Sequence, residues 1–450
     1  MQNPKISRRA GLAALAAGLL PLGAKAASQR KVIVIGAGLA GLAAARVLQD
    51  AGVETRILEA RDRIGGRTWT SHLWPDMPMD LGASWIHGVK GNPLTALADA
   101  AGAIRLPTSY DAAMALNAEG QELDLSDATA ATEALIAAAR DAVDDLDDDT
   151  SLMAAVTAHP GWTEADAATR RLIRQVVNST VEHEYGGAWS EVSAWYFDEG
   201  SDFGGTDAIF ADGYGKVVDH LAEGLDIRLG HAVTGLAPTA KGVTVSLANG
   251  ETLLADQVVV TIPLGALRAG HIAFAEPLSA PRQAAIDMLR MGLLNKCVLR
   301  FDRISWPDDV DWIQWVGPQD GHFAEWVSLA KPARQPVLMA FHAGDQARAR
   351  EDLSDAEMQA DAHSALKSMF GSAFPTPIAA QITRWAQDPF TLGSYSFNAV
   401  GVTPKTRKAL AGEDWDARLL FAGEATSTDY FGTAHGAVLS GRAAAKRILR

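Results

Sequence analysis

The chain has 450 residues and a formal net charge of −14, and 48% of its residues are hydrophobic. This length exceeds a typical single core, so we expect two domains. The acidic balance argues against a nucleic-acid partner and is compatible with cationic substrates. A single cysteine excludes a disulfide or a cysteine metal cluster within the chain, and the 11 histidines show no metal-ligand spacing, so we predict no metal site.

Residues 1–26 predict a twin-arginine export signal. Arg8 and Arg9 precede an apolar stretch from Ala10 to Leu22, and Ala24-Lys25-Ala26 forms a small-x-small cleavage site. The alternative is a membrane anchor, but a stretch of about 13 residues is shorter than the roughly 20 that span a bilayer. We therefore expect a periplasmic or secreted bacterial protein that meets the twin-arginine export machinery transiently, with no stable membrane insertion after cleavage.

The next segment predicts a dinucleotide-binding unit. Residues 32–35 form an apolar, β-branched run that suits a buried strand, and Leu39 to Asp50 predict a helix. Between and within them, Gly36, Gly38 and Gly41 have GxGxxG spacing. These glycines allow a tight turn, close approach of the backbone to a pyrophosphate, and close packing of helix on strand.

A second strand, at 54–58, delivers Glu59, whose carboxylate can accept hydrogen bonds from ribose hydroxyls. The segment that follows, Arg63-Ile-Gly65-Gly66-Arg67, resembles the second phosphate-contacting loop of FAD enzymes rather than a nicotinamide-binding fold. The alternative is an ordinary glycine turn flanked by surface arginines.

Further along the chain, residues 122–180 have helical apolar spacing. The acidic run at 141–149 within them is interpreted as a solvated helix face or loop, with a field that attracts polycations as the alternative. A helix is expected at 209–221 and a hairpin turn at Asn249-Gly250. Strands are expected at 225–233, 242–247, 257–262 and 296–301.

Five segments together resemble the flavin-dependent amine oxidase family, nearest its polyamine oxidase and spermine oxidase branch. They are the unit at 31–67, Asp80 to Gly88 with Asn92 to Leu94, Val258 to Leu267, Arg384 to Phe397, and Phe421 to Gly441. Residues 111–180 match the family poorly.

The resemblance implies an α/β fold of two domains. The first is a discontinuous, Rossmann-like FAD-binding domain at 29–90, 205–290 and 405–450. The second is an inserted α+β substrate-binding domain at 91–204 and 291–404, with a mixed sheet and helices.

The resemblance also implies a non-covalent FAD, since no cysteine precedes the last segment and Cys297 lies in another motif. Glu59 would hold the adenosine ribose, Arg67 a phosphate, and Glu424 the ribityl or pyrophosphate end. Val233 would meet the adenine through its backbone. The full set of implied FAD contacts is Gly36, Gly38, Leu39, Ala40, Gly41, Glu59, Ala60, Arg61, Gly65, Gly66, Arg67, Gly82, Ala83, Ser84, Trp85, Val233, Trp385, Gly423, Glu424, Thr433 and Ala434.

Two catalytic residues follow from the same resemblance. Lys296 would reach a water near flavin N5, and His87 would bind or deprotonate the substrate amine. The alternatives are a solvated strand lysine and a hydrogen-bonded core histidine. The inner wall would be formed by Phe397 and Thr433, with Tyr395 as a further substrate contact and Glu184 as an outer acid.

The implied activity is oxidation of polyamines. A hydride leaves the carbon beside a primary or secondary amine for FAD, the imine hydrolyses, and O2 reoxidises the flavin to give hydrogen peroxide. The alternatives are a monoamine or amino-acid oxidase, an amine dehydrogenase with another electron acceptor, and a flavoprotein without enzymatic activity.

Overall fold

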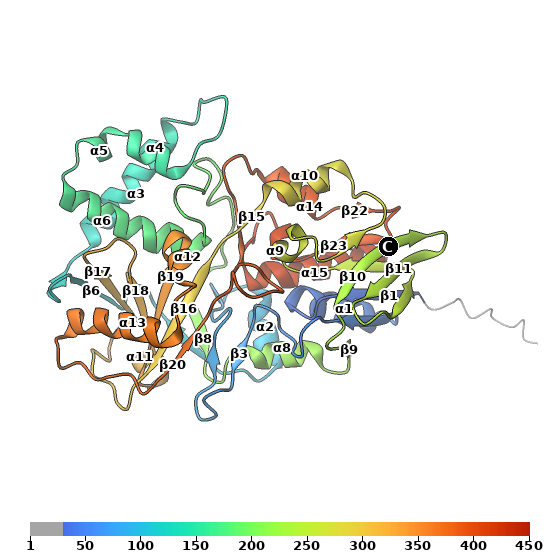
Figure 1. Ribbon diagram of the computed structural model, residues 1–450, viewed down its shortest axis with the longest axis horizontal. Coiled ribbons are helices and arrows are strands. Elements are labelled where there is room, and N and C mark those ends of the chain that lie inside the picture. The colour runs from blue at the N-terminus through green and yellow to red at the C-terminus, as the bar shows by residue number, and fades with distance from the viewer. Residues whose placement is uncertain (1–29) are drawn as a thin grey trace, which may run out of the picture.

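The computed structural model describes residues 30–450, so the predicted export signal at 1–26 lies outside the described residues. Within residues 30–450 the chain forms two parts that lie side by side along the long axis of the molecule, each built on a large sheet (Figure 1). This arrangement confirms the predicted two-domain α/β fold. No helix in this range combines the length and the apolar character needed to cross a membrane.

The dinucleotide-binding part contains, within residues 30–450, a six-stranded sheet. Its central strands are parallel, with Ile35 opposite Leu58 on one side and Val260 on the other. The order is β22 (Glu413–Asp414), β23 (Leu419–Phe421), β13 (Gln257–Val260), β1 (Lys31–Ile35), β2 (Glu54–Leu58) and β9 (Asp226–Arg228).

Both faces of this sheet are covered, as the apolar run of β1 predicts. Val32 and Val34 pack against the helices α1 (Leu39–Asp50), α8 (Gly215–Ala222) and α15 (Ala434–Ile448). Ile33 and Ile35 face a second sheet, whose order is β12 (Thr252–Ala255), β11 (Gly242–Leu247), β10 (Val233–Thr239) and β14 (Ala273–Phe274). The predicted hairpin at 249–250 joins β11 and β12.

Two predicted elements in this part are wrong in extent. The helix expected at 209–221 is a strand, β8 (Asp207–Phe210), followed by α8, because Gly213 at φ +86° turns the chain between them. The strand expected at 225–233 is divided between β9 and β10 by a turn in which Gly230 has φ +69°. In both cases a glycine in the left-handed region ends one element before the next begins.

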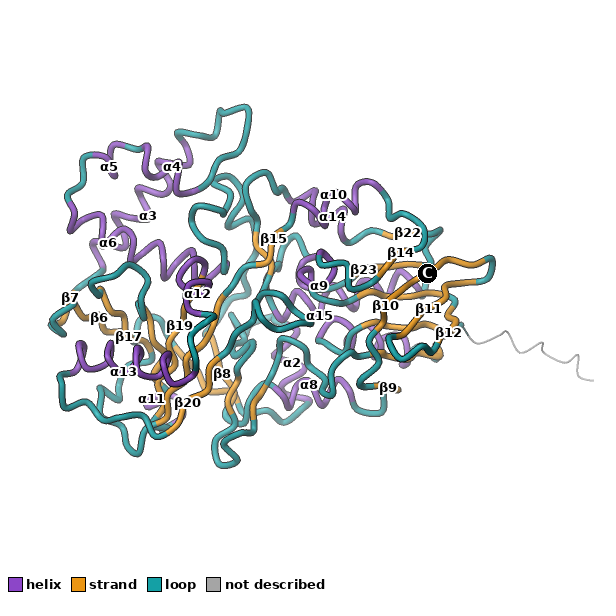
Figure 2. Tube along the Cα trace, in the orientation of Figure 1, coloured by secondary structure: helices purple, strands orange, loops and turns teal. Residues whose placement is uncertain are grey.

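The substrate-binding part contains, in the described residues, a seven-stranded mixed sheet, seen on the left in Figures 1 and 2. Its order is β20 (Ala379–Ile382), β16 (Leu294–Arg300), β19 (Val337–Ala343), β18 (Glu325–Ser328), β17 (Trp312–Val316), β6 (Ala113–Asn117) and β7 (Glu122–Leu123).

Side chains alternate across this sheet, and one face is closed by α13 (Asp355–Phe370). Cys297 and Leu299 of β16 pack on that face, whereas Val298 packs on the other. The helices of the predicted 122–180 region are α3 (Ser126–Asp141), α4 (Leu152–Ala158), α5 (Pro160–Thr163) and α6 (Ala167–Val177), followed by a π-helical turn at Asn178–Glu182 and α7 (His183–Tyr185).

One helix that follows the predicted domain boundary at residue 90 packs in the other part of the molecule. Helix α2 (Pro93–Ala100) was assigned to the substrate-binding domain, but its Leu94 and Ala98 pack into the core of the dinucleotide-binding part with α1 and α8. The remaining short elements are β3 (Thr70–Ser71), β4 (Met79–Asp80), β5 (Arg105–Thr108), α9 (Leu264–Arg268), α10 (Ala280–Met288), β15 (Arg290–Met291), α11 (Ala330–Ala333), α12 (Gly344–Arg350), β21 (Ser396–Phe397), α14 (Pro404–Leu410) and a 3₁₀ turn at Glu424–Thr426.

Candidate active site

A cavity of about 630 Å³ is lined by both parts of the molecule. It begins at the GxGxxG turn after β1 and extends to Lys296 and to a group of aromatic side chains on the seven-stranded sheet. With the exceptions of Gly41 and Phe397, every residue predicted from the sequence to contact FAD or substrate lines this cavity. The predicted site is therefore brought together in one place.

Gly41 acts in packing rather than in the cavity wall, which corrects its assignment as a cofactor contact. A Cβ atom at this position would lie 1.9 Å from the carbonyl oxygen of Gly36 and 2.9 Å from Thr261 Oγ1. Its lack of a side chain lets α1 start directly beside the turn that follows β1. Gly38, in contrast, is the N-cap residue of α1 and lines the cavity, and in residues 30–450 no side chain caps this helix. The first N–H groups of α1 are thus left to bind an anion.

The carboxylate of Glu59 is fixed at the end of β2. Its Oε2 accepts a hydrogen bond from the backbone N–H of Ala37 at 2.7 Å, and its Oε1 accepts one from Arg61 N–H at 2.9 Å. The residue is 7% exposed and lines the cavity. These contacts orient the carboxylate across the β1–α1 turn, where a ribose would lie beside a pyrophosphate held at α1.

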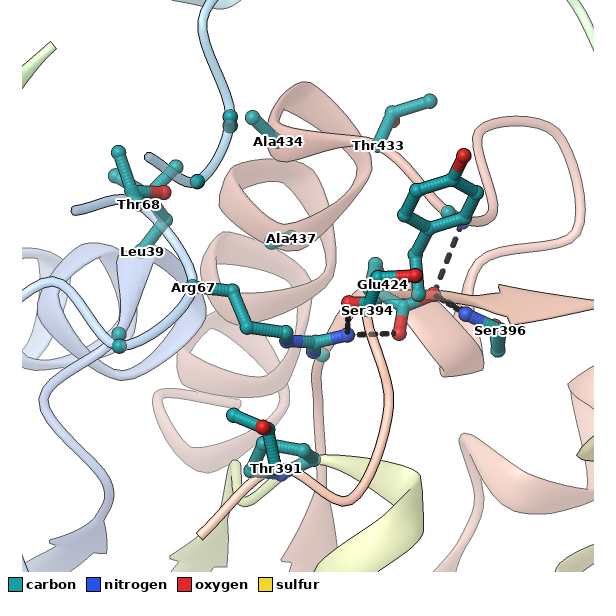
Figure 3. Close-up of a pocket in the computed structure, with 18 of the residues that line it drawn as sticks. Leu39, Arg67, Thr68, Thr391, Ser394, Ser396, Glu424, Thr433, Ala434 and Ala437 are labelled. Atoms are coloured by element: carbon teal, nitrogen blue, oxygen red, sulfur yellow. Dashed lines mark hydrogen bonds and ion pairs between the residues drawn. The ribbon is translucent and has the colours of Figure 1, made fainter. Parts of the chain in front are cut away.

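Arg67, which is half-buried, and Glu424, which is buried, form an ion pair in the cavity wall (Figure 3). Arg67 Nη1 donates to Glu424 Oε1 at 2.7 Å and to the Ser394 carbonyl at 3.0 Å. Glu424 Oε2 also accepts from Ser396 Oγ at 2.6 Å and from Gly432 N–H at 2.9 Å. Burial opposes ionisation, but Arg67 and the Ser396 hydroxyl outweigh it and hold the pKa of Glu424 below its ordinary value.

Lys296 lies on the cavity face of β16 and is 5% exposed. Its Nζ donates to the carbonyls of Asp80 at 3.0 Å and Gly82 at 2.6 Å, and to Ser84 Oγ at 2.5 Å. In the described residues no carboxylate forms an ion pair with it, and burial lowers the pKa of its ammonium group. The alternative of a solvated strand lysine is therefore excluded.

His87 lies at the edge of the same cavity, with its side chain 48% exposed. Its Nδ1 is 3.0 Å from Asp207 Oδ2, and its ring stacks on Trp85 with the ring centroids 6.3 Å apart. Burial opposes protonation, but the carboxylates of Asp207 and Glu184 raise the pKa of the imidazole above its ordinary value. His87 is therefore a cavity residue with a carboxylate partner rather than a core histidine.

The aromatic wall is Tyr395 rather than Phe397. Phe397 is 1% exposed and packs in the core, where a Cβ atom at Gly187 would come within 2.8 Å of its ring, so its predicted place in the inner wall is wrong. Tyr395 lines the cavity, and its hydroxyl donates to the His183 carbonyl at 2.6 Å. Thr433 also lines the cavity and at the same time caps α15, with its Oγ1 accepting from Gly436 N–H at 2.9 Å (Figure 3).

The structure adds a second acid–base pair that the sequence did not reveal. His183 Nδ1 lies 2.9 Å from Glu325 Oε2, both residues are buried, and both line the cavity. Among the described residues His183 Nε2 has no hydrogen-bond partner. Tyr110, Trp312 and Phe341 also line this part of the cavity. Tyr110 lies in the turn before β6, whereas Trp312 and Phe341 lie in β17 and β19, whose apolar sequences do not indicate which face of the sheet borders the cavity.

The remaining predicted residues lie as follows. Glu184 lines the cavity with an exposed side chain. Val233 lines it at the first residue of β10, and Trp385 lines it while packing edge-to-face on Trp69, with the ring centroids 6.4 Å apart. In residues 30–450 no group of three or more His, Cys, Asp or Glu side chains is arranged to hold a metal ion.

Comparisons with known proteins agree with this geometry. The family model described as flavin containing amine oxidoreductase matches residues 39–449. The chain is 34% identical to probable polyamine oxidase 4 of Arabidopsis thaliana over 445 residues, which cover 94% of this chain and 87% of that protein. It is 33% identical to polyamine oxidase 2 of the same plant, over 92% of this chain and 87% of that one.

Among solved structures, a double mutant of putrescine oxidase with redesigned cofactor binding matches with a TM-score of 0.74 at 20% identity. The match covers 94% of this chain and 99% of that chain. At this identity the likeness concerns the fold alone.

Proposed function

The chain belongs to the flavin containing amine oxidoreductase family, and from this premise we propose that this FAD-dependent amine oxidase acts on polyamines with oxygen as electron acceptor. Bound FAD supplies the hydride acceptor for the carbon beside the amine and then reduces O2 to hydrogen peroxide. The imine that is released hydrolyses in water to an aldehyde and a shorter amine.

The residues of the cavity fit FAD. The uncapped start of α1 offers N–H groups to a pyrophosphate, and the Glu59 carboxylate is oriented beside it. The start of α15 at Thr433 and Ala434 lines the other end of the cavity, where the partial positive charge of a helix N-terminus favours an anionic ring. Cys297 is fully buried in the core on the α13 face of its sheet, which supports a non-covalent cofactor.

The charge of the cavity wall is the observation that supports a polyamine as the substrate. Five carboxylates outside the predicted FAD contacts line the cavity: Glu184, Asp198, Asp202, Glu325 and Asp429. Asp198 is paired with Arg140 and Glu325 with His183, whereas Glu184, Asp202 and Asp429 form no ion pair among the described residues. The arginines among the described lining residues are Arg61 and Arg67, and each is already paired with a carboxylate. A substrate with several ammonium groups fits this wall, whereas an amino-acid carboxylate would lack a free arginine.

The reacting nitrogen itself must be neutral, because hydride loss from its α-carbon needs the lone pair. An alkylamine has a pKa near 10.4, so deprotonation at pH 7 costs about 4.6 kcal/mol, and a carboxylate beside it would increase this cost. The surroundings of Lys296 Nζ meet this need, since its hydrogen-bond acceptors are carbonyl and hydroxyl oxygens rather than carboxylates. The ammonium group of Lys296 also repels a second positive charge and so disfavours the protonated form of a substrate amine that binds beside it.

Two side chains then have distinct tasks. Lys296 holds a proton at Nζ beside the predicted flavin position and orders water there. His87, with Asp207 on its Nδ1, is placed to accept a proton from the incoming amine. At the far wall, His183 Nε2 and Glu325 are available to a distal ammonium group of a polyamine.

The test is anaerobic mixing of the purified yellow protein with spermine, spermidine, putrescine and an aromatic monoamine. We expect polyamines to bleach the flavin fastest, and peroxide to appear when air is admitted. Faster bleaching by the monoamine would replace the polyamine assignment, and bleaching without peroxide would favour a dehydrogenase. A Glu325→Gln protein should raise KM for spermine more than for the monoamine, with Glu251→Gln on the surface as a control.

We further propose that the protein is exported to the periplasm by the twin-arginine route, on the basis of residues 1–26. Cell fractionation tests this step. The full-length chain should appear in the periplasmic fraction with FAD bound, and an Arg8→Lys, Arg9→Lys double variant should remain in the cytoplasm. Export of the double variant would contradict the proposal.

A further inference from the structure

A loop from the substrate-binding part lies along the cofactor end of the cavity. Residues 385–393, here termed the strap, follow β20 and lead into Ser394 and Tyr395. Trp385, Phe390 and Thr391 of the strap line the cavity. The strap therefore forms part of the wall that encloses the cofactor, although it belongs to the other half of the molecule.

The strap has a defined internal structure. The backbone N–H of Gly393 donates to the Trp385 carbonyl at 2.8 Å and closes the loop at its base. Asp388 organises its centre, because its Oδ1 accepts from Phe390 N–H at 3.0 Å and its carbonyl accepts from Leu392 N–H at 3.0 Å. These hydrogen bonds make the strap a compact loop whose two ends lie close together.

On its inner side the strap rests on α9. A Cβ atom at Gly265 would lie 2.2 Å from the carbonyl oxygen of Thr391, so there is no space between the strap and this helix. The strap therefore cannot move closer to α9, and a movement that opens the cavity has to take it away from this helix.

That loop holds the strap through two arginines. Arg61 Nη2 donates to Asp388 Oδ1 at 2.5 Å, with the two side chains only 12% and 20% exposed, and its guanidinium lies 5.0 Å from the centroid of the Phe390 ring. Arg67 donates to the carbonyl of Ser394, at the end of the strap, at 3.0 Å (Figure 3). Arg61 is 327 residues from Asp388 in the chain, so the pair joins the two parts of the molecule.

We propose that the Arg61–Asp388 ion pair is a latch that fastens the strap over the cofactor cavity and slows the release of FAD. An outward movement of the strap breaks this pair and leaves both charges without their partner in a half-buried place, which raises the barrier to opening. The arginine of the latch therefore serves the cofactor through the strap, as a positioning residue, in addition to lining its cavity.

The test measures the release of FAD from the purified holoprotein after dilution into an excess of a flavin-binding apoprotein, followed by flavin fluorescence. Asp388→Asn keeps an oxygen for Phe390 N–H but removes the charge. Arg61→Gln removes the pair from the other side, together with the contact of Arg61 with the Phe390 ring and with the cavity. Each variant should release FAD at least about ten-fold faster, as expected for the loss of one charge-assisted hydrogen bond. The double variant should release it no faster than the faster single variant, because both changes remove the same contact.

Asp226→Asn is the control, since Arg56 of β2 and Asp226 of β9 form a 2.7 Å ion pair in the same part of the molecule but do not line the cavity. Release within two-fold of the wild-type rate in either latch variant would overturn the proposal. So would an equal acceleration in Asp226→Asn, or additive effects in the double variant. If Asp388→Asn gives no soluble protein, Asp388→Ser answers the same question, because Asp388, unlike Arg61, does not line the cavity. Because no amine is used, the result is independent of the substrate.

Discussion

The two glycines at 38 and 41 belong to one motif, but the structure predicts opposite consequences when each is replaced by alanine. At Gly41 a Cβ atom would lie 1.9 Å from the Gly36 carbonyl oxygen, a backbone atom that cannot move without shifting the β1–α1 turn. At Gly38 the nearest atom to a Cβ would be the Gly65 carbonyl oxygen at 3.9 Å, an ordinary contact. Gly38 lines the cavity, and a methyl group there would take space from a bound pyrophosphate.

The expected energies follow from these contacts. Overpacking a core costs about 1–3 kcal/mol and more when the backbone must move, and alanine returns about 1 kcal/mol of helix propensity at Gly41. Because the atom in the way is a backbone oxygen, the overpacking cost lies at or above about 3 kcal/mol, and after the gain in helix propensity we expect Gly41→Ala to destabilise the apoprotein by about 2 kcal/mol or more. Gly38→Ala at a helix N-cap should cost the apoprotein less than about 1 kcal/mol, but should weaken FAD binding at least ten-fold.

Chemical denaturation of the apoprotein and titration with FAD separate the two effects. Gly41→Ala should lower the free energy of unfolding before any FAD is added, whereas Gly38→Ala should unfold like the wild type and differ only in the gain of stability on adding FAD. Gly204→Ala serves as a control, because a Cβ atom there meets no atom within 4 Å. Equal destabilisation of the apoprotein by both motif substitutions would refute the reasoning.

Three further predictions concern charged groups. Lys296→Met should slow flavin reduction or reoxidation by about 10²- to 10⁴-fold in stopped-flow measurements, as for the loss of a proton-transfer group, and unchanged rates in both half-reactions would remove its catalytic role. Glu424→Gln leaves Arg67 without its buried partner and should lower the free energy of unfolding of the apoprotein by about 3 kcal/mol in urea at pH 7. The difference from the wild type should be smaller at low pH, where the wild-type carboxylate is also protonated. A difference that does not depend on pH would contradict this. Burial lowers the pKa of His435 from 6.5 to about 4. Between these pH values the imidazole is protonated in the unfolded chain but not in the folded one, so the free energy of unfolding should fall by up to about 3 kcal/mol as pH drops from 6.5 towards 4. His435→Phe should flatten that part of the stability profile, and an unchanged profile would show that another group titrates.

Much of the fold could be predicted because its signals are local. Neighbouring residues define the strand at 32–35, the glycine turn after it and the helix that follows. Helix α1 accordingly has the predicted limits, Leu39 and Asp50. Lys296 could be placed on a strand for the same reason. Alternation then puts it on the face opposite Cys297, but nothing in the segment tells which face borders a cavity. The pairing of Glu325 with His183 depends on contacts between distant segments, so no local pattern could reveal it.

That Tyr395 rather than Phe397 lines the cavity shows where strand alternation fails to predict the direction of a side chain. The two aromatic residues are two positions apart, so in a regular strand both side chains would point to the same side, and the sequence offers no reason to separate them. The strand β21 contains only Ser396 and Phe397, and Tyr395 lies in the irregular backbone before it. Phe397 can turn into the core because Gly187 leaves room for its ring, and the Tyr395 hydroxyl is held by the His183 carbonyl. A Gly187→Ala protein should therefore push Phe397 from the core and lower stability, while Phe397→Leu should leave the KM for spermine nearly unchanged and Tyr395→Leu should raise it.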